Sequence, residues 1–146
     1  MVCPLLAGFA CQWGSDVAES TSRNRQKADE MLIAVVQIPR SSPKPAKDAA
    51  VARGLDSAPI YRDVKGLIRK DYLNGEDCGG GVYTFESREA AEAWFNDDWW
   101  GWIEERFGAC PTLTFYDHYV TVDNAAGEVR VDGAAVDLPK GSEAAE

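Results

Sequence analysis

Short apolar runs and helix-like patterns alternate through the middle of the chain. Residues 32–38 form an apolar, β-branched run closed by Pro39, which is typical of a buried strand. Residues 46–57 place apolar side chains at helical spacing with charged side chains on the other face, and Pro59 interrupts that pattern. The pattern therefore predicts a strand followed by a helix.

The next segment predicts a β-hairpin. Residues 66–73 alternate so that Ile68, Lys70 and Tyr72 share one face, and residues 82–85 continue as a third strand. An Asn-Gly pair between the two runs is a strong turn signal. The triple glycine that follows lacks the Lys and Ser or Thr of a phosphate loop, so we interpret it as a flexible connection.

Two helical segments and a last strand complete the pattern. Ser87 is placed to cap a helix, and an Asn-Asp-Asp break precedes a second segment that Asp98 caps and Gly108 ends. The final strand covers residues 112–122. A loose hairpin is expected over residues 129–138, around an Asp-Gly pair.

The predicted order is βαββαβ, which defines an α+β, ferredoxin-like fold. It gives a four-stranded antiparallel sheet with two helices on one face. The opposite face is too apolar for open water, above all in the first strand, so we expect a second subunit to cover it. The sequence thus predicts a homodimer.

Composition divides the chain into three parts. Residues 31–124 hold the patterned domain. Residues 1–30 are mostly polar after a short apolar start, and we interpret them as a disordered or a spurious N-terminal extension ahead of Met31. Residues 125–146 are rich in Gly, Ala and acidic side chains and are expected to form a flexible C-terminal tail.

Charge and cysteine content narrow the partners. The chain has 146 residues with 15 basic and 24 acidic side chains, a net charge of −9. This charge repels phosphate backbones, and no basic amphipathic run is present, so neither nucleic acid nor a membrane surface is an expected partner. The four cysteines and the single histidine lack zinc-site spacing, so we expect no metal and reduced thiols in a cytoplasmic protein.

The hairpin brings together the first candidate site residues. Lys70 and Tyr72 share a face of one strand, and Tyr83 lies on one face of the next. If the faces align, an amine and two phenols form one cluster that can deprotonate a substrate and stabilise its anion. The structural alternative is an exposed lysine stem beside two core tyrosines.

His118 is a second candidate base because its ordinary pKa lies near neutral pH. It shares strand parity with Tyr116, a candidate for substrate binding. A single strand histidine can equally be structural or exposed.

Four of the five tryptophans crowd into residues 94–102. By helical spacing, Trp94, Trp99 and Trp102 lie on inner faces. We assign Trp94 and Trp99 to the lining of a ligand pocket and Trp102 to the core, although core packing alone would explain all three.

Four stretches carry a family resemblance: Met31–Ala34, Tyr61–Leu73, Gly79–Phe95 and Phe107–Asn124. In order and spacing they resemble the dimeric α+β barrel superfamily, and within it the YdhR-like group of small monooxygenases, distant relatives of the antibiotic-biosynthesis monooxygenases. One departure is Lys65-Gly66-Leu67, where the family often has Pro-Gly-Leu.

The resemblance implies a homodimer with face-to-face sheets and a pocket between sheet and helices. It implies a monooxygenase that acts with O₂ on a small aromatic or quinol-like compound, without cofactor. His118, Tyr72 and Lys70 are then the catalytic candidates, and Tyr83, Trp94, Trp99 and Tyr116 the substrate-binding candidates. The alternatives are a non-enzymatic dimeric module that binds a small ligand or assembles, and a small isomerase or dehalogenase-like activity.

Overall fold

The computed structural model describes residues 30–138. Its elements are β1 (Leu32–Pro39), α2 (Lys47–Arg62), β2 (Leu67–Asn74), β3 (Cys78–Phe85), α3 (Arg88–Trp94), α4 (Asp97–Phe107), β4 (Thr112–Asp117), β5 (Val120–Asp123), β6 (Glu128–Val131) and β7 (Ala134–Val136). The N-terminal extension proposed from the sequence lies outside the described residues, except for its last position.

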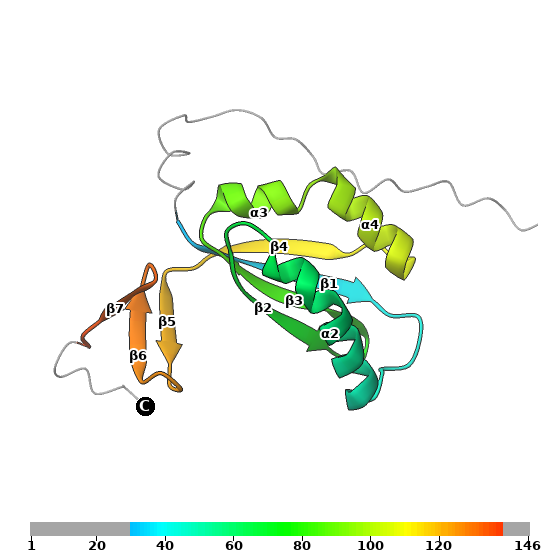
Figure 1. Cartoon of the computed structure of the whole chain (residues 1–146), viewed down its shortest axis with the longest axis horizontal. Helices are drawn as coiled ribbons and strands as arrows, with labels where there is room; N and C mark the ends of the chain where they lie inside the picture. Colours follow the sequence, from blue (N-terminus) through cyan, green and yellow to red (C-terminus); the bar gives the residue numbers. More distant parts are fainter. Residues whose placement is uncertain (1–29, 139–146) are drawn as a thin grey trace, which may run out of the picture.

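The main sheet has the strand order β2-β3-β1-β4 (Figure 1). All its neighbouring strands are antiparallel, and β1 lies in the centre between β3 and β4. This order, with one helix after β1 and a broken helix after β3, is the ferredoxin-like βαββαβ arrangement. The predicted fold class is confirmed.

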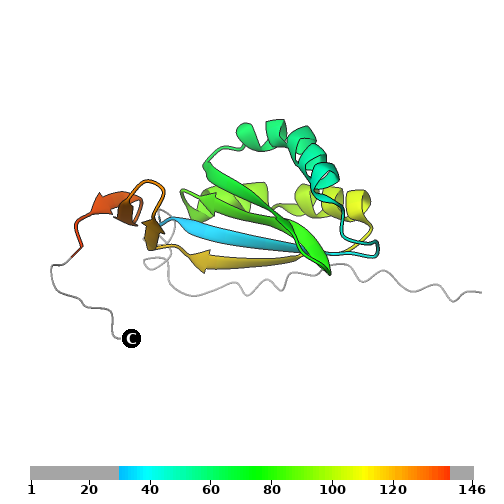
Figure 2. The ribbon, with the colours of Figure 1, turned by 90° about the horizontal axis from the view of Figure 1, so that it is seen from below.

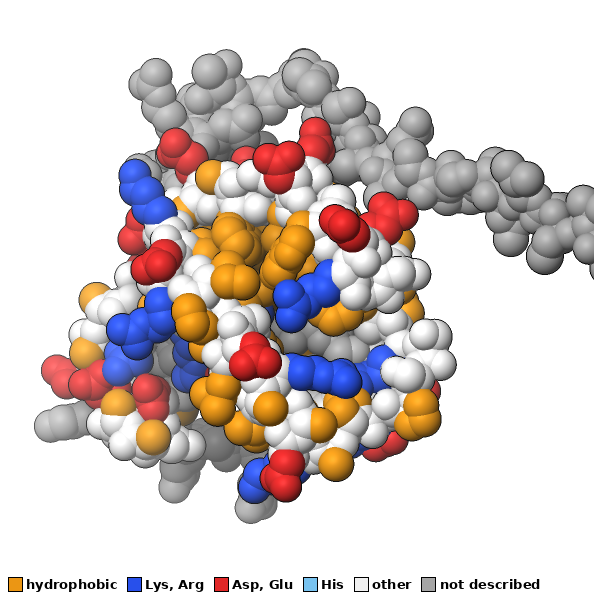
Figure 3. Space-filling model, turned by 45° about the vertical axis from the view of Figure 1, so that its right-hand side comes forward, with side chains coloured by type: hydrophobic (Ala, Val, Ile, Leu, Met, Phe, Trp, Pro, Cys, Tyr) orange, Lys and Arg blue, Asp and Glu red, His pale blue; other side chains and the backbone are white. Residues whose placement is uncertain are grey.

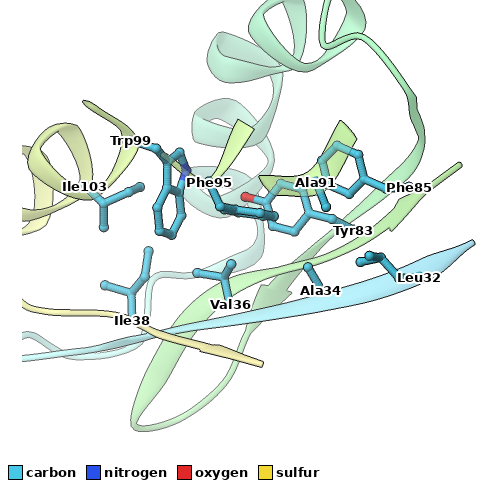
Figure 4. Packing of buried hydrophobic residues seen from close by; sticks show 10 residues of the cluster. All are labelled: Leu32, Ala34, Val36, Ile38, Tyr83, Phe85, Ala91, Phe95, Trp99 and Ile103. Carbon is cyan, nitrogen blue, oxygen red and sulfur yellow. The ribbon is translucent and has the colours of Figure 1, made fainter. Parts of the chain in front are cut away.

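All three helices lie on one side of the sheet (Figure 2). Alternate residues of β1 point toward them, and Leu32, Ala34 and Val36 are almost fully buried. They pack against an aromatic layer that includes Phe85 of β3 and Phe95 beside α3 (Figure 4). One apolar core between sheet and helices therefore holds the domain together.

The helix ends follow the chemistry of their caps. The Ser87 hydroxyl accepts from the Ala90 backbone N–H, and Gly108 ends α4 with a φ of 64°. Both positions were predicted. The cap of α4 is Asn96, whose Oδ1 accepts from the backbone N–H of Trp99, so the assignment of this cap to Asp98 was wrong.

Helix α2 differs from its sequence pattern in two ways. It continues through Pro59, which the pattern placed at an interruption. Its inward side is not the apolar stripe, because Leu55 is 68% exposed and Val51 is 49% exposed, whereas Ser57 is buried. Small and polar side chains face the sheet on this helix.

The triple glycine lies inside β3 rather than in a loose connection. Gly80 has a φ of 134°, a conformation that L side chains rarely adopt. A Cβ built at this position would lie 2.0 Å from the Val36 carbonyl oxygen of the neighbouring strand. Only glycine fits here, and it lets β3 run close along β1.

The last predicted strand divides in two. Residues 112–117 form β4 of the main sheet, whereas β5 begins at Val120 and joins β6 and β7 in a three-stranded antiparallel sheet. The predicted hairpin around Asp132-Gly133 is β6–β7. Secondary structure thus continues to Val136, and residues 139–146 lie outside the described part.

One cysteine expectation was wrong. Cys110 is disulfide-bonded, whereas Cys78 is a free thiol as the sequence analysis expected.

We expect Gly80→Ala to lower the free energy of unfolding by more than about 2 kcal/mol, because the substitution adds both backbone strain and a clash with β1. Urea denaturation measures this loss. Gly101→Ala is the matched control. A Cβ at this exposed position of α4 meets nothing within 4 Å, so it should be neutral or stabilise by about 0.5–1 kcal/mol. Equal stability of Gly80→Ala and the wild type would contradict the conformation assigned to β3.

Candidate functional site

A cavity of about 260 Å³ lies between the sheet and the helices. Its walls come from α2, α4, the ends of β1, β2 and β3, and the loop after β1. In the space-filling view, hydrophobic side chains gather around a hollow, and Lys and Arg side chains lie at its edge (Figure 3). The cavity is slightly smaller than the roughly 300–1,000 Å³ typical of small-molecule pockets.

Lys70 is enclosed by aromatic rings at the inner wall of this cavity. Its Nζ lies 3.1 Å from the centroid of the Tyr61 ring, 4.0 Å from that of Tyr72 and 4.9 Å from that of Tyr83. Lys70 forms no ion pair with any carboxylate of residues 30–138. The amine is thus surrounded by ring faces without a compensating negative charge.

Opposing forces act on the charge of Lys70. The three rings attract its ammonium form through their quadrupoles. Burial penalises the charged form most strongly, the positive charge of Arg106 adds to the penalty, and together they lower the pKa of Lys70 to about 7. At neutral pH a large share of the amine is therefore unprotonated and can accept a proton.

The phenols of Tyr61 and Tyr83 stay neutral. Burial raises the pKa of Tyr83 and of Tyr61, so their phenols can donate hydrogen bonds but do not ionise near neutral pH. The Tyr72 hydroxyl lies 2.8 Å from the Oγ of Ser57, the buried polar residue of α2. This hydrogen bond fixes the Tyr72 ring between the helix and the sheet.

Glycine makes room for this cluster on β3. A Cβ at Gly81 would lie 3.1 Å from the Lys70 Cε and 3.2 Å from the Tyr83 ring. Any side chain here would push the lysine stem or the phenol out of place. The glycine therefore lets Lys70 and Tyr83 lie side by side.

The structure brings together three of the residues predicted from the sequence. Lys70 lies directly opposite Tyr83 in the β2–β3 pairing, and Tyr72 lies opposite Gly81. All three side chains line the cavity on the helix side of the sheet. A bulge between Leu67 and Arg69 removes Ile68 from this face, which strict alternation had included.

His118 does not share this site. It follows Asp117, which pairs with Leu32 at the far end of β1 from the cavity. Neither His118 nor any residue of β4 belongs to the cavity lining. The His118 Nε2 instead lies 2.8 Å from the Thr121 hydroxyl oxygen.

Tyr116 lies on the opposite face of the sheet. Its neighbour Phe115 pairs with the buried Ala34 and packs on the core, whereas Tyr116 pairs with Ile33 and is 54% exposed. The strand alternation that places Phe115 inward directs Tyr116 outward.

The tryptophans are arranged differently from the prediction. Trp99 is buried and packs edge-on against Phe95, with ring centroids 4.8 Å apart, and Trp102 lines the cavity. Trp94 is not part of the lining, but its ring lies 5.9 Å from that of the lining residue Tyr61. All three rings pack in or against the core, and helical spacing alone did not distinguish core packing from cavity lining.

Several lining residues were missed from the sequence, namely Tyr61, Ser57 and the arginines Arg40, Arg53 and Arg106. A signal existed in α2, because Arg53, Ser57 and Tyr61 recur every four residues and so lie on one side of a helix. The prediction instead placed the apolar side of α2 against the sheet.

Within the part of the chain that the structure describes, no group of three or more His, Cys, Asp or Glu is arranged to hold a metal ion. No helix in residues 30–138 is long and apolar enough to cross a membrane.

Comparison with solved structures finds similar folds at low identity. One is a Streptomyces coelicolor monooxygenase from the gene ActVA-Orf6, in complex with the ligand nanaomycin D. It is 16% identical, with a TM-score of 0.48, over 70% of this chain and 97% of that one. Another is a Caulobacter crescentus protein proposed to be an antibiotic biosynthesis monooxygenase. It is 17% identical, with a TM-score of 0.44, over 66% of this chain and 97% of that one. No protein-family model and no curated protein matches the chain.

We expect Lys70 to titrate near pH 7, which NMR can follow through the lysine side-chain ¹³Cε resonances after assignment with Lys70→Met. Arg106→Gln removes a like charge and should raise this pKa. Arg62→Gln, which changes an arginine outside the cavity, should leave it unchanged. A Lys70 pKa at the ordinary lysine value would contradict the enclosed position of the amine.

Proposed function

We propose that the chain is a cofactor-independent monooxygenase that oxidises a small aromatic or quinol-like compound in the cavity between sheet and helices. The observation that carries the proposal is the Lys70 amine, a base available near neutral pH inside an aromatic cavity. The sequence resemblance to the dimeric α+β barrel monooxygenases supports the same reaction class.

The cavity suits a flat, electron-rich ring. Tyr61, Tyr83 and Trp102 supply aromatic wall, and offset or edge contacts of this kind contribute roughly 0.5–1.5 kcal/mol per ring pair. The neutral phenols of Tyr61 and Tyr83 can donate hydrogen bonds to a substrate oxygen. Binding there places an acidic O–H or C–H of the substrate beside the Lys70 amine.

The reaction needs proton removal and charge stabilisation from the protein. Neutral Lys70 accepts a proton from the substrate, and the positive charge of Arg106 favours the resulting anion. The anion supplies electrons to O₂. For a bicyclic naphthohydroquinone, one oxygen atom enters the ring as the hydroxyl oxygen of a hydroxynaphthoquinone, the other leaves as water, and no external reductant is consumed.

We expect Lys70→Met to lower O₂-dependent turnover by about 10²- to 10⁴-fold, the usual contribution of a positioned base. The assay follows oxygen uptake with a panel of naphthohydroquinones, corrected for their spontaneous oxidation. In the wild type, kcat/KM should rise with pH through a value near 7, because the unprotonated amine is the active form.

Lys44→Met is the control, because Lys44 pairs with Glu76 outside the cavity lining and should leave turnover unchanged. Full turnover in Lys70→Met would exclude Lys70 as the base. Ring compounds that bind at the cavity without any oxygen uptake would contradict the monooxygenase and favour a non-enzymatic ligand-binding module.

We also propose that the functional unit is a homodimer joined through the sheet face that carries no helix. Ile33, Val35 and Val82 share this face with the exposed Tyr116, which makes it apolar across three strands. Burial of such a face against a second copy would remove it from water.

Light scattering should therefore give twice the 16.0 kDa chain mass, and Val35→Lys should shift the protein to the single-chain mass. Leu55→Lys is the control, since Leu55 is an exposed apolar residue on α2, away from the open sheet face. A wild-type protein with the mass of one chain at micromolar concentration would overturn the dimer.

A further inference from the structure

The cavity reverses the charge balance of the chain. Acidic side chains outnumber basic ones by 24 to 15 in the sequence. The cavity lining nevertheless contains no Asp or Glu but four basic residues, namely Arg40, Arg53, Lys70 and Arg106. The local field in the cavity is therefore positive in a negatively charged protein.

The charges in the lining lack carboxylate partners. Within residues 30–138, none of the four forms an ion pair, whereas Arg69, Arg88 and Arg130 outside the cavity each pair with a carboxylate. The positive charge of the cavity is thus available to a ligand.

Arg40 is held in place by neutral groups. Its Nη2 donates to the Asn74 Oδ1 at 2.9 Å and lies 3.4 Å from the Cys78 carbonyl oxygen. Its Nε is buried and has no hydrogen-bond partner among the described residues. A buried donor without a partner is costly, and an acceptor on a ligand or a water would satisfy it.

Guanidinium groups next to an aromatic wall favour a ligand that has both an anionic group and a flat ring. Guanidinium groups match the planar geometry of a carboxylate and can bind it through two hydrogen bonds. The aromatic wall beside them takes a flat ring, and a volume of about 260 Å³ limits the ring system to one or two fused rings.

We propose that this cavity selects mono- or bicyclic aromatic carboxylates, with the ring against Tyr61 and Tyr83 and the carboxylate toward Arg40, Arg53 and Arg106. The inference rests on the cavity being the site of the proposed function, and it names the substrate class of that site as aromatic acids. A neutral or cationic aromatic compound of the same shape is a poorer ligand.

Isothermal titration calorimetry at low ionic strength tests this selection with two probes of nearly equal shape, 2-naphthoate and the uncharged 2-naphthamide. The acid should bind the wild type at least about tenfold more tightly than the amide, the usual effect of a charge-assisted hydrogen bond. Arg53→Gln and Arg106→Gln should each reduce that preference by about threefold to tenfold, and the amide affinity should stay the same.

Arg62→Gln is the matched control. Arg62 lies on the same helix as Arg53 and forms no ion pair within residues 30–138, but it does not line the cavity. This variant should keep the full preference for the acid. A loss of preference equal to that of Arg53→Gln would show a general charge effect and overturn the inference.

The proposed selection would also be overturned if the acid and the amide bound with equal affinity, or if neither probe bound. It would likewise be overturned if both Arg53→Gln and Arg106→Gln kept the full preference for the acid. The outcome is separate from that of the oxygenation assay. Selective binding of 2-naphthoate can hold in a protein that never consumes oxygen, and turnover of a neutral naphthohydroquinone can hold in a cavity without acid preference.

Discussion

The contact between the Tyr61 ring and the Lys70 ammonium group joins helix α2 to the sheet. The Tyr61 ring also meets Tyr72 and Tyr83 edge-on, at centroid distances of 6.1 and 5.8 Å, and Trp94 at 5.9 Å. One side chain thus links α2 with β2, β3 and α3. Its position places the lysine on the inside of the domain and keeps solvent from one side of the amine.

The cavity follows from the way α2 packs. This helix directs Gly54, Ser57 and Tyr61 inward instead of large aliphatic side chains, whereas α4 contributes Trp99 and Ile103 to the core. Helices α3 and α4 therefore cover the sheet tightly, whereas α2 covers it loosely. The space left between them is lined by phenols, an amine and guanidinium groups, a surface suited to a flat anion.

Strand alternation made part of this site predictable. Lys70, Tyr72 and Tyr83 could be placed on one face because side chains of a strand alternate and a short hairpin fixes the pairing. His118 could not be placed in the same way, because β4 ends at Asp117 and the alternation does not continue past that residue.

The helical part of the site was harder to predict because hydrophobicity indicates a core and not a cavity. Leu55 is a large apolar residue of α2 and yet 68% exposed, whereas the small Gly54 faces the Tyr72 ring. The tryptophan assignment failed because helical spacing places a ring on an inner face without distinguishing core from cavity. Four-residue spacings, as between Trp102 and Arg106, would have identified the lining without any reference to hydrophobicity.

The measurement that tests the account most directly is a crystal structure of the full chain soaked with 2-naphthoate. The account predicts density for the ligand between α2 and α4, with its ring against Tyr61 and Tyr83 and its carboxylate within hydrogen-bond distance of an arginine of the lining. A ligand bound on the open face of the sheet, or an unchanged cavity beside a ligand held elsewhere, would contradict the claim that Lys70 and its tyrosines form the binding site.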